Sequence, residues 1–267
     1  MPTYVQSHVT KVYQGSANPP VLDKVVFTID HIHQGGPGLY STLDVVRFLV
    51  GKQIPVTIFI QCTDPLNLCP VERASAAQLF ALAPHLVKLA PHSLSPKNSQ
   101  LAQRNNLNLI QNVIADTTGA RSRVMSYHGS GAGPENGINY ARGIKTSLMT
   151  QSSNPLDTPV MGLNSVKSAF NYISSRNLAG LSATLFVHSF ELRNGTTKKR
   201  VFDTFVKEVQ ARRLQAVDYH LAMRSDYTSS PTAPTTPTTP TTPSPSCPPL
   251  ALLWLTFLAT YYRKTYV

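Results

Sequence analysis

The stretch Val25–His33, VVFTIDHIH, decides what kind of fold this chain can form. Its first five residues are apolar or β-branched, which is typical of a strand buried on both faces in a parallel sheet. The run ends directly in Asp30 and His31, with His33 two residues further on. A carboxylate and imidazoles at the carboxyl end of a buried strand lie where α/β folds place their chemistry. Taken alone, the cluster is equally consistent with an Asp that caps a turn beside two solvated histidines.

The rest of the chain repeats this arrangement. Seven strands are predicted, at residues 25–30, 56–60, 85–90, 123–127, 144–149, 183–187 and 215–219. Helical patterns separate them, at residues 41–50, 74–83, 99–116, 166–175 and 200–211. This alternation predicts an α/β fold with parallel strands closed into a barrel. Later strands lead into His92, His128 and His188, and barrels gather strand ends on one face. We therefore expect Asp30, His92 and His188 to lie within roughly 10 Å of one another.

Composition limits the partners. The chain has 267 residues, with 24 Lys and Arg against 13 Asp and Glu, for a formal net charge of +11. Such an excess favours anionic partners, such as phosphate-bearing polymers, acidic glycans or a membrane surface. The longest basic run is Lys198–Arg200, and no repeat of aromatic and basic residues resembles a nucleic-acid module. We expect no nucleic-acid partner and interpret the charge as a general surface bias.

The C-terminal part differs from the rest in composition. The PTT repeat at residues 231–243 offers no large apolar residue to bury, which predicts an extended spacer. The apolar run Leu250–Tyr262 that follows would form a helix of roughly 20 Å, shorter than the ~30 Å hydrocarbon core. It could be a tilted-in anchor, part of a lipid-anchor signal, or a helix that docks elsewhere. The expected parts are an N-terminal arm (1–22), a barrel (23–225), a disordered Thr/Pro-rich stalk or linker (226–249) and an apolar segment (250–267).

Cysteines and termini bear on the compartment. Cys62 and Cys69 lie close together in one predicted loop, as a small disulfide or as two free thiols, while Cys247 stands alone. The N-terminus, MPTYVQSHVTKVYQG, has no recognisable signal peptide. An incomplete start, non-classical export and retention inside the cell are all consistent with it. A stalk before an apolar tail is typical of surface display, so we expect a cell-surface or extracellular protein, membrane-associated through Leu250–Tyr262.

The order of these segments resembles the polysaccharide deacetylases of carbohydrate esterase family four, over roughly residues 24–222. The family's motifs T-F-D-D, H-S/T-x-x-H, R-x-P-Y and L-x-H are similar, in that order, to Thr28–His31, His92–Ser95, Arg123–Tyr127 and Leu185–His188. The third of these carries one extra residue. Known members fold as distorted (β/α) barrels, which agrees with the strand count and implies a distorted (β/α)7-type barrel.

The resemblance also implies an activity. It implies a metal-dependent hydrolase that removes N- or O-linked acetyl groups from a polysaccharide. Asp30 would be the general base that deprotonates a metal-bound water, His92 a metal ligand, and His188 the acid that protonates the departing amine. The backbone N–H near Tyr127 would help hold the oxyanion, and Arg123 would contact the substrate.

Two departures from the family pattern concern the metal. His31 replaces the metal-binding Asp, and Pro96 stands where the second metal-binding His is expected. Three other histidines could complete a set with His92: His31, His33 and His128. Three nitrogen ligands suit Zn²⁺. The alternative, from a different class, is a catalytically inactive deacetylase-like barrel that binds glycans at a surface. A hydrolase of another type, inside the cell, is a third hypothesis, because a fold does not fix a function.

Overall fold

The computed structural model describes these residues of the chain: 24–62, 69–95, 97–127, 138, 140–146, 158–161, 166–174 and 182–223. The chain divides into two units, residues 1–230 and 231–267, and every described residue belongs to the first. The predicted arm, stalk and apolar tail therefore lie outside the described residues. Within the described ranges no helix combines the length and the apolar character that a membrane span requires.

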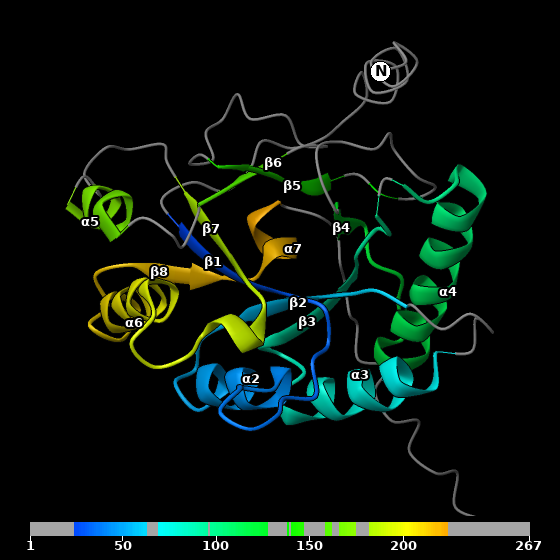
Figure 1. The fold of residues 1–267 in the computed structure, drawn as a ribbon, viewed down its shortest axis with the longest axis horizontal. Helices are drawn as coiled ribbons and strands as arrows, with labels where there is room; N and C mark the ends of the chain where they lie inside the picture. Colours follow the sequence, from blue (N-terminus) through cyan, green and yellow to red (C-terminus); the bar gives the residue numbers. More distant parts are fainter. Residues whose placement is uncertain are drawn as a thin grey trace, which may run out of the picture. The chain divides into compact units, whose positions relative to one another are not determined.

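The strands of the described part run parallel in two sheets (Figure 1). Their bounds are β1 Lys24–Asp30, β2 Val56–Ile60, β3 Val87–Pro91, β4 Val124–Ser126, β5 Tyr140–Thr146, β6 Thr158–Val160, β7 Ala183–Val187 and β8 Gln215–Val217. The first sheet has the order β3-β2-β1-β7, with β8 also paired to β1, and the second has the order β4-β5-β6. The prediction of an α/β fold with parallel strands is thus confirmed.

Two isolated bridges join the sheets into a ring. His92 pairs with Ser126, which links β3 to β4, and Met161 pairs with Leu185, which links β6 to β7. Since β1 lies between β2 and β7, these links complete a ring of seven strands from β1 to β7. Strand β8 pairs with the amino-terminal half of β1, beside the half that pairs with β2. The ring is therefore the barrel, and β8 is an addition to it.

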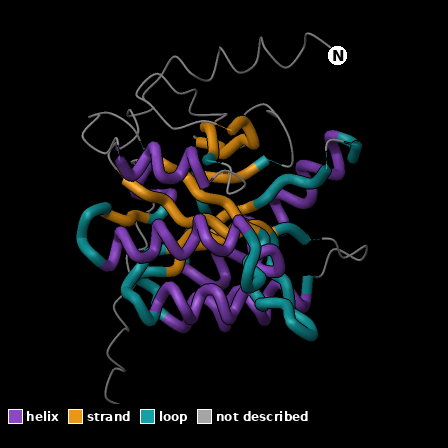
Figure 2. Tube along the Cα trace, turned by 60° about the vertical axis from the view of Figure 1, so that its left-hand side comes forward, coloured by secondary structure: helices purple, strands orange, loops and turns teal. Residues whose placement is uncertain are grey.

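Helices cover the strands on their outer side (Figure 2), except for the short last helix of the described residues, which packs inside the ring. Their bounds are α2 Thr42–Val50, α3 Pro70–Leu82, α4 Gln100–Thr118, α5 Val166–Ser174, α6 Thr197–Gln210 and α7 Tyr219–Ala222, with a 3₁₀ turn, η1, at Ser189–Glu191. Helix α2 begins with a capping box, because the Asp44 N–H donates to Ser41 Oγ and the Ser41 N–H donates to Asp44 Oδ2. Gly119 ends α4 with a φ of +82°, a conformation that glycine adopts without strain.

The two faces of β1 pack against different neighbours. Phe27 faces outward, with its ring 5.6 Å from that of Phe202 on α6. Val26 belongs instead to an inner cluster with Phe59 of β2. Because successive strand residues point to opposite faces, Asp30 points to the same side as Val26, into the ring. The chemistry-bearing end of β1 is thus directed at the barrel interior.

Two strand predictions are corrected by the structure. The fifth strand was expected at 144–149 but begins four residues earlier and ends three residues earlier, at Tyr140–Thr146, and β6 was not predicted. The last strand was expected at 215–219 and ends at Val217, because Asp218 caps α7 by accepting a hydrogen bond from the Leu221 N–H. Tyr219 then enters the inner cluster, where its N–H donates to Thr57 Oγ1. Helix α7 therefore fills the ring instead of extending a sheet.

A buried Ser–His–Asp group links α7 to the start of β4. His220 Nε2 lies 3.0 Å from Ser122 Oγ, and its Nδ1 lies 3.8 Å from Asp218 Oδ1. Ser122 Oγ also donates to the Val124 carbonyl, and all three side chains are buried. Burial lowers the pKa of His220 to about 3, and the charge of Lys88 acts in the same direction. The group is a structural link in which the imidazole is neutral.

This neutral imidazole predicts a loss of stability in mild acid. The unfolded histidine binds a proton below pH ~6.5, whereas native His220 does so only near pH 3. The free energy of unfolding should therefore fall as pH falls below ~6.5, by up to ~1.4 kcal/mol per pH unit. The contribution of His220 to this fall should end below the pKa of the native histidine. Asp218, whose pKa burial raises, acts in the opposite direction. Urea unfolding between pH 6.5 and 4.5 measures the effect: the free energy of unfolding should depend less on pH in His220→Gln than in wild type.

The control is His85→Gln, which removes an exposed histidine. We expect this variant to keep the wild-type dependence on pH. A His220→Gln protein that loses stability with falling pH as steeply as wild type would contradict the assignment.

Candidate active site

The carboxylate of Asp30 is held by an arginine from the far side of the ring. Arg142, on β5, places Nη2 2.6 Å from Oδ1 and 2.5 Å from Oδ2 of Asp30. The arginine is fully buried, and its guanidinium carbon lies 5.0 Å from the ring centroids of both Phe59 and Phe186. Contact with two aromatic faces partly compensates a cation that has lost its water. Asp30 and Arg142 thus form a buried ion pair across the barrel.

This pair decides the protonation state of Asp30. Burial alone would raise the pKa of the carboxyl group, but the charge of Arg142 and the contact with His92 outweigh it. The pKa of Asp30 is therefore held well below its usual range, and the group is ionised at neutral and mildly acidic pH. A carboxylate with a lowered pKa is a weak base, so it accepts a proton readily only from a strongly acidified donor.

Two histidines stand next to Asp30. His92 Nε2 lies 3.6 Å from Asp30 Oδ2, and His92 Nδ1 lies 2.7 Å from the Ser93 carbonyl oxygen. The ring of His31 is centred 4.4 Å from that of His92. His31 has a φ of +62°, in the left-handed region that costs a non-glycine residue roughly 1–2 kcal/mol. Its N–H donates to the Phe59 carbonyl, which helps to hold this conformation.

A third histidine stacks on His31. The His188 ring, just after β7, is nearly parallel to that of His31, with centroids 5.5 Å apart. His188 Nδ1 lies 3.2 Å from Glu191 Oε2 in η1, and Glu191 Oε1 accepts a hydrogen bond from Lys198. Burial would raise the pKa of Glu191, but its contacts with His188 and Lys198 outweigh this and lower the pKa to about 2. An ionised carboxylate therefore orients the His188 ring.

The structure brings together the central residues predicted from the sequence. Asp30, His31, His92 and His188 form a continuous series of neighbours from the ends of β1, β3 and β7. His33 lies further along the chain, where its Nδ1 accepts a hydrogen bond from the Gly35 N–H and its ring is 5.0 Å from that of Phe190. It does not adjoin His92.

The other predicted site residues lie elsewhere or are engaged. Tyr127 is buried after β4, and its N–H already donates to the Arg142 carbonyl, so in this structure that donor belongs to the sheet. Arg123 is exposed and precedes β4, at the end of the strand opposite to Tyr127. His128 and Pro96 lie outside the described residues.

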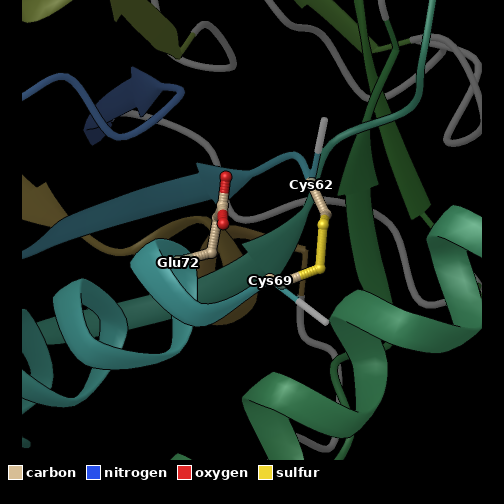
Figure 3. A group of neighbouring side chains, drawn as sticks. All are labelled: Cys62, Cys69 and Glu72. Carbon is tan, nitrogen blue, oxygen red and sulfur yellow. A yellow bond between two sulfur atoms is a disulfide. The ribbon is translucent and has the colours of Figure 1, made fainter. Parts of the chain in front are cut away.

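No three-ligand set is formed at the strand ends within the described residues. Elsewhere among the described residues, one group of three His, Cys, Asp or Glu side chains has its ligand atoms within 4.8 Å of one another. This group is Cys62, Cys69 and Glu72 (Figure 3). The two sulfurs of that group are joined in a disulfide. This settles the question that the sequence left open about the two thiols.

Sequence reasoning missed two residues of the site. Arg142 lay two residues before the predicted fifth strand, outside every predicted element, and was not assigned a role. Glu191 follows His188 by three residues, a spacing that places both side chains on one side of a short turn. That spacing is a signal that could have been used.

Comparison with protein-family models and with curated proteins finds no match to the sequence. Among solved structures, the chain matches PuuE allantoinase with a TM-score of 0.52 and 11% identity, over 80% of this chain and 95% of that one. It also matches the peptidoglycan deacetylase PdaC from Bacillus subtilis (TM-score 0.43, 14% identity, 79% and 93%). A third match is BA3943, a CE4 family pseudoenzyme from Bacillus anthracis (TM-score 0.43, 13% identity, 78% and 70%).

These likenesses bear on the fold. At identities of 11 to 14%, a structural match establishes the fold alone, and the allantoinase match does so here. The fold is therefore an α/β barrel of parallel strands, like that of the matched allantoinase structure.

Proposed function

We propose that this chain is a hydrolase of the polysaccharide deacetylase type, which removes N- or O-linked acetyl groups from a polysaccharide. The observation that carries the proposal is the series Asp30, His31, His92 and His188, gathered from three strand ends at one mouth of the ring. Parallel barrels place their reaction centres at this mouth. An ionised carboxylate and imidazoles are groups that can accept and donate the protons of acyl hydrolysis.

His188 is the acid of the proposed reaction. An amine leaves an acetylated carbon only if it is protonated, so a proton donor must face the leaving nitrogen. Because His188 Nδ1 faces Glu191, Nε2 is the nitrogen that can donate this proton. Asp30 is the acceptor on the other side, and Arg142 positions it without touching the substrate. The two roles are thus assigned to groups on different strands.

The surroundings of His92 fit a divalent ion that prefers nitrogen ligands. A metal-binding histidine usually directs its second nitrogen to a carbonyl or carboxylate, as Nδ1 of His92 does toward Ser93. His92 and its neighbour His31 would hold the ion. When bound, the ion would acidify a water and polarise the acetyl carbonyl, which suits the weak base Asp30. Imidazole ligands favour Zn²⁺, Co²⁺ or Ni²⁺ over Mg²⁺.

A second function is favoured by two specific observations. Within the described residues, no three ligand atoms at the strand ends gather within 4.8 Å of one another, whereas the family uses three ligands, and both oxygens of Asp30 are bound by Arg142. An inactive barrel that binds glycans at the same mouth would need neither a third ligand nor a free carboxylate. The two functions predict opposite results with metal ions.

Metal removal tests the proposed function. Hydrolysis of an acetylated oligosaccharide should be abolished by a chelator and restored by Zn²⁺ or Co²⁺ but not by Mg²⁺. His92→Ala should bind less metal and lose activity, whereas His85→Ala, at an exposed position, should keep both. Release of acetate and metal content are the two measurements. Activity that survives both chelation and His92→Ala would exclude this mechanism, and glycan binding without hydrolysis or metal would support the binding barrel.

The polysaccharide partner is proposed to lie at a cell surface, with Leu250–Tyr262 holding the chain at a membrane. This location would not require the segment for folding, because the described core is built from residues 24–223. A protein that ends at Thr228 should therefore keep the wild-type midpoint of thermal unfolding and lose only its partition into liposomes. A lower midpoint would indicate that residues 229–267 pack on the barrel.

A further inference from the structure

The Cys62–Cys69 disulfide lies on the same side of the barrel as the strand ends, between β2 and α3 (Figure 3). Cys62 follows β2 by two residues, and Cys69 immediately precedes Pro70, the first residue of α3. Both cysteines are buried, and their Cα atoms are 5.7 Å apart. Glu72 stands on the first turn of α3, with a carboxylate oxygen within 4.8 Å of both sulfurs.

Among the described residues, the carboxylate of Glu72 has no salt-bridge partner that would explain its position. Its neighbour Arg73 is directed elsewhere, to Asp116 at 2.6 Å. Glu72 is half-buried, and it makes no hydrogen bond or ion pair to another part of the chain that the structure describes. A helix start favours a carboxylate by itself, but here it also places the carboxylate beside two sulfurs. The three side chains together are the ligand types of a zinc site.

We propose that reduction converts this disulfide into a second metal site, in which Cys62, Cys69 and Glu72 bind one Zn²⁺ or similar thiophilic ion. A dithiol reductant breaks the sulfur–sulfur bond by supplying two electrons and two protons, and is itself oxidised to a disulfide. Binding of the ion then releases the two thiol protons to solvent. Two thiolates and one carboxylate are the protein ligands, and a water completes the tetrahedron.

The geometry permits this change. Two sulfurs bound to one tetrahedral Zn²⁺ at ~2.3 Å lie roughly 3.8 Å apart. With Cα atoms 5.7 Å apart, rotation about the Cα–Cβ bonds can supply the separation without moving the backbone. Cys69 is the N-cap residue of α3, where the positive end of the helix dipole favours a thiolate. The site does not share a ligand with the histidine cluster and does not depend on the proposed function.

The test uses the full chain carrying Cys247→Ser, so that only two thiols can form. A phosphine reductant opens the disulfide, taking oxygen from water to become its oxide. We expect the reduced protein to bind one more Zn²⁺ per chain than the oxidised protein. With Co²⁺ it should show the thiolate-to-cobalt charge-transfer absorption, which histidine ligands do not produce. Cys62→Ser should remove the added ion and the absorption, and Glu72→Gln should weaken binding about 10-fold or more.

His92→Ala is the matched control, because it alters the histidine cluster and should keep the added ion. Equal ion counts in the two redox states, or a cobalt–thiolate absorption that persists in Cys62→Ser, would overturn the proposal. Far-ultraviolet circular dichroism follows folding in the same samples. If reduction unfolds the chain, Zn²⁺ must restore the native spectrum in the Cys247→Ser background but not when Cys62→Ser is added. A chain that stays unfolded with Zn²⁺ would also overturn it.

Discussion

Replacing Arg142 by methionine is expected to lower the free energy of unfolding by about 3–5 kcal/mol. The change leaves the Asp30 carboxylate inside the ring without the cation that holds its pKa down. Methionine keeps much of the contact with Phe59 and Phe186, so the loss reports the charge and not a cavity. Urea unfolding followed by circular dichroism at neutral pH is the measurement.

Two further variants of the chain serve as controls for this result. Arg73→Met breaks an equally short ion pair, 2.6 Å from Asp116, but at exposed side chains, and should cost at most about 1 kcal/mol. Asp30→Asn combined with Arg142→Met removes both charges, so it should recover much of the stability lost in Arg142→Met alone. An Arg142→Met protein as stable as Arg73→Met would contradict the buried ion pair between Asp30 and Arg142.

Replacing His188 by glutamine is expected to lower kcat by ~10²–10⁴-fold on an acetylated oligosaccharide. This prediction rests on the proposed function, in which His188 delivers the proton to the leaving group. The side chain is half-buried and its loss leaves no cavity in the core, so the thermal midpoint should change little. The KM should also change little, because the proton transfer belongs to the transition state. Initial rates across substrate concentrations measure both parameters.

His85→Gln, an exposed histidine before β3, serves as the control and should behave as wild type. Glu191→Gln should reduce kcat by less than His188→Gln does, because Glu191 orients the ring and does not itself transfer the proton. A His188→Gln enzyme with wild-type kcat would remove this residue from the mechanism. A simultaneous loss of fold would point to a structural role instead.

The sequence allowed the core strands to be predicted because they follow the simplest rule. Strands β1 and β2 are buried on both faces, and such strands are continuous apolar runs. Strand β6 has only three residues, with Pro159 in the middle, and a proline normally argues against a strand. Strand β5 was misplaced because Arg142 is a charged residue inside a barrel. What stabilises it there, two aromatic rings from other strands, is not visible locally.

The same distinction applies to the candidate site. Convergence of Asp30, His92 and His188 followed from strand order, because topology alone brings strand ends together. The pairing of Asp30 with Arg142 joins residues 112 positions apart, and no local pattern specifies it. The engagement of the Tyr127 N–H likewise depends on where β5 lies. Placement on the barrel mouth was therefore predictable, while the partners that set charge and orientation were not.

The two bridges that complete the ring imply that local stability differs around the barrel. Along the junction of β3 and β4, the described cross-strand bonding is narrow, with the Ser93 N–H donating to the Ser126 carbonyl. A seam held by so few bonds opens at lower free energy than the paired strands β1 and β2, so its amides should exchange with solvent earlier. His92 is itself the residue at this seam. Because the His92 N–H donates to the Ile60 carbonyl of β2, an opening of this seam would leave the candidate metal ligand attached to β2 and expose it to solvent on the side of β4.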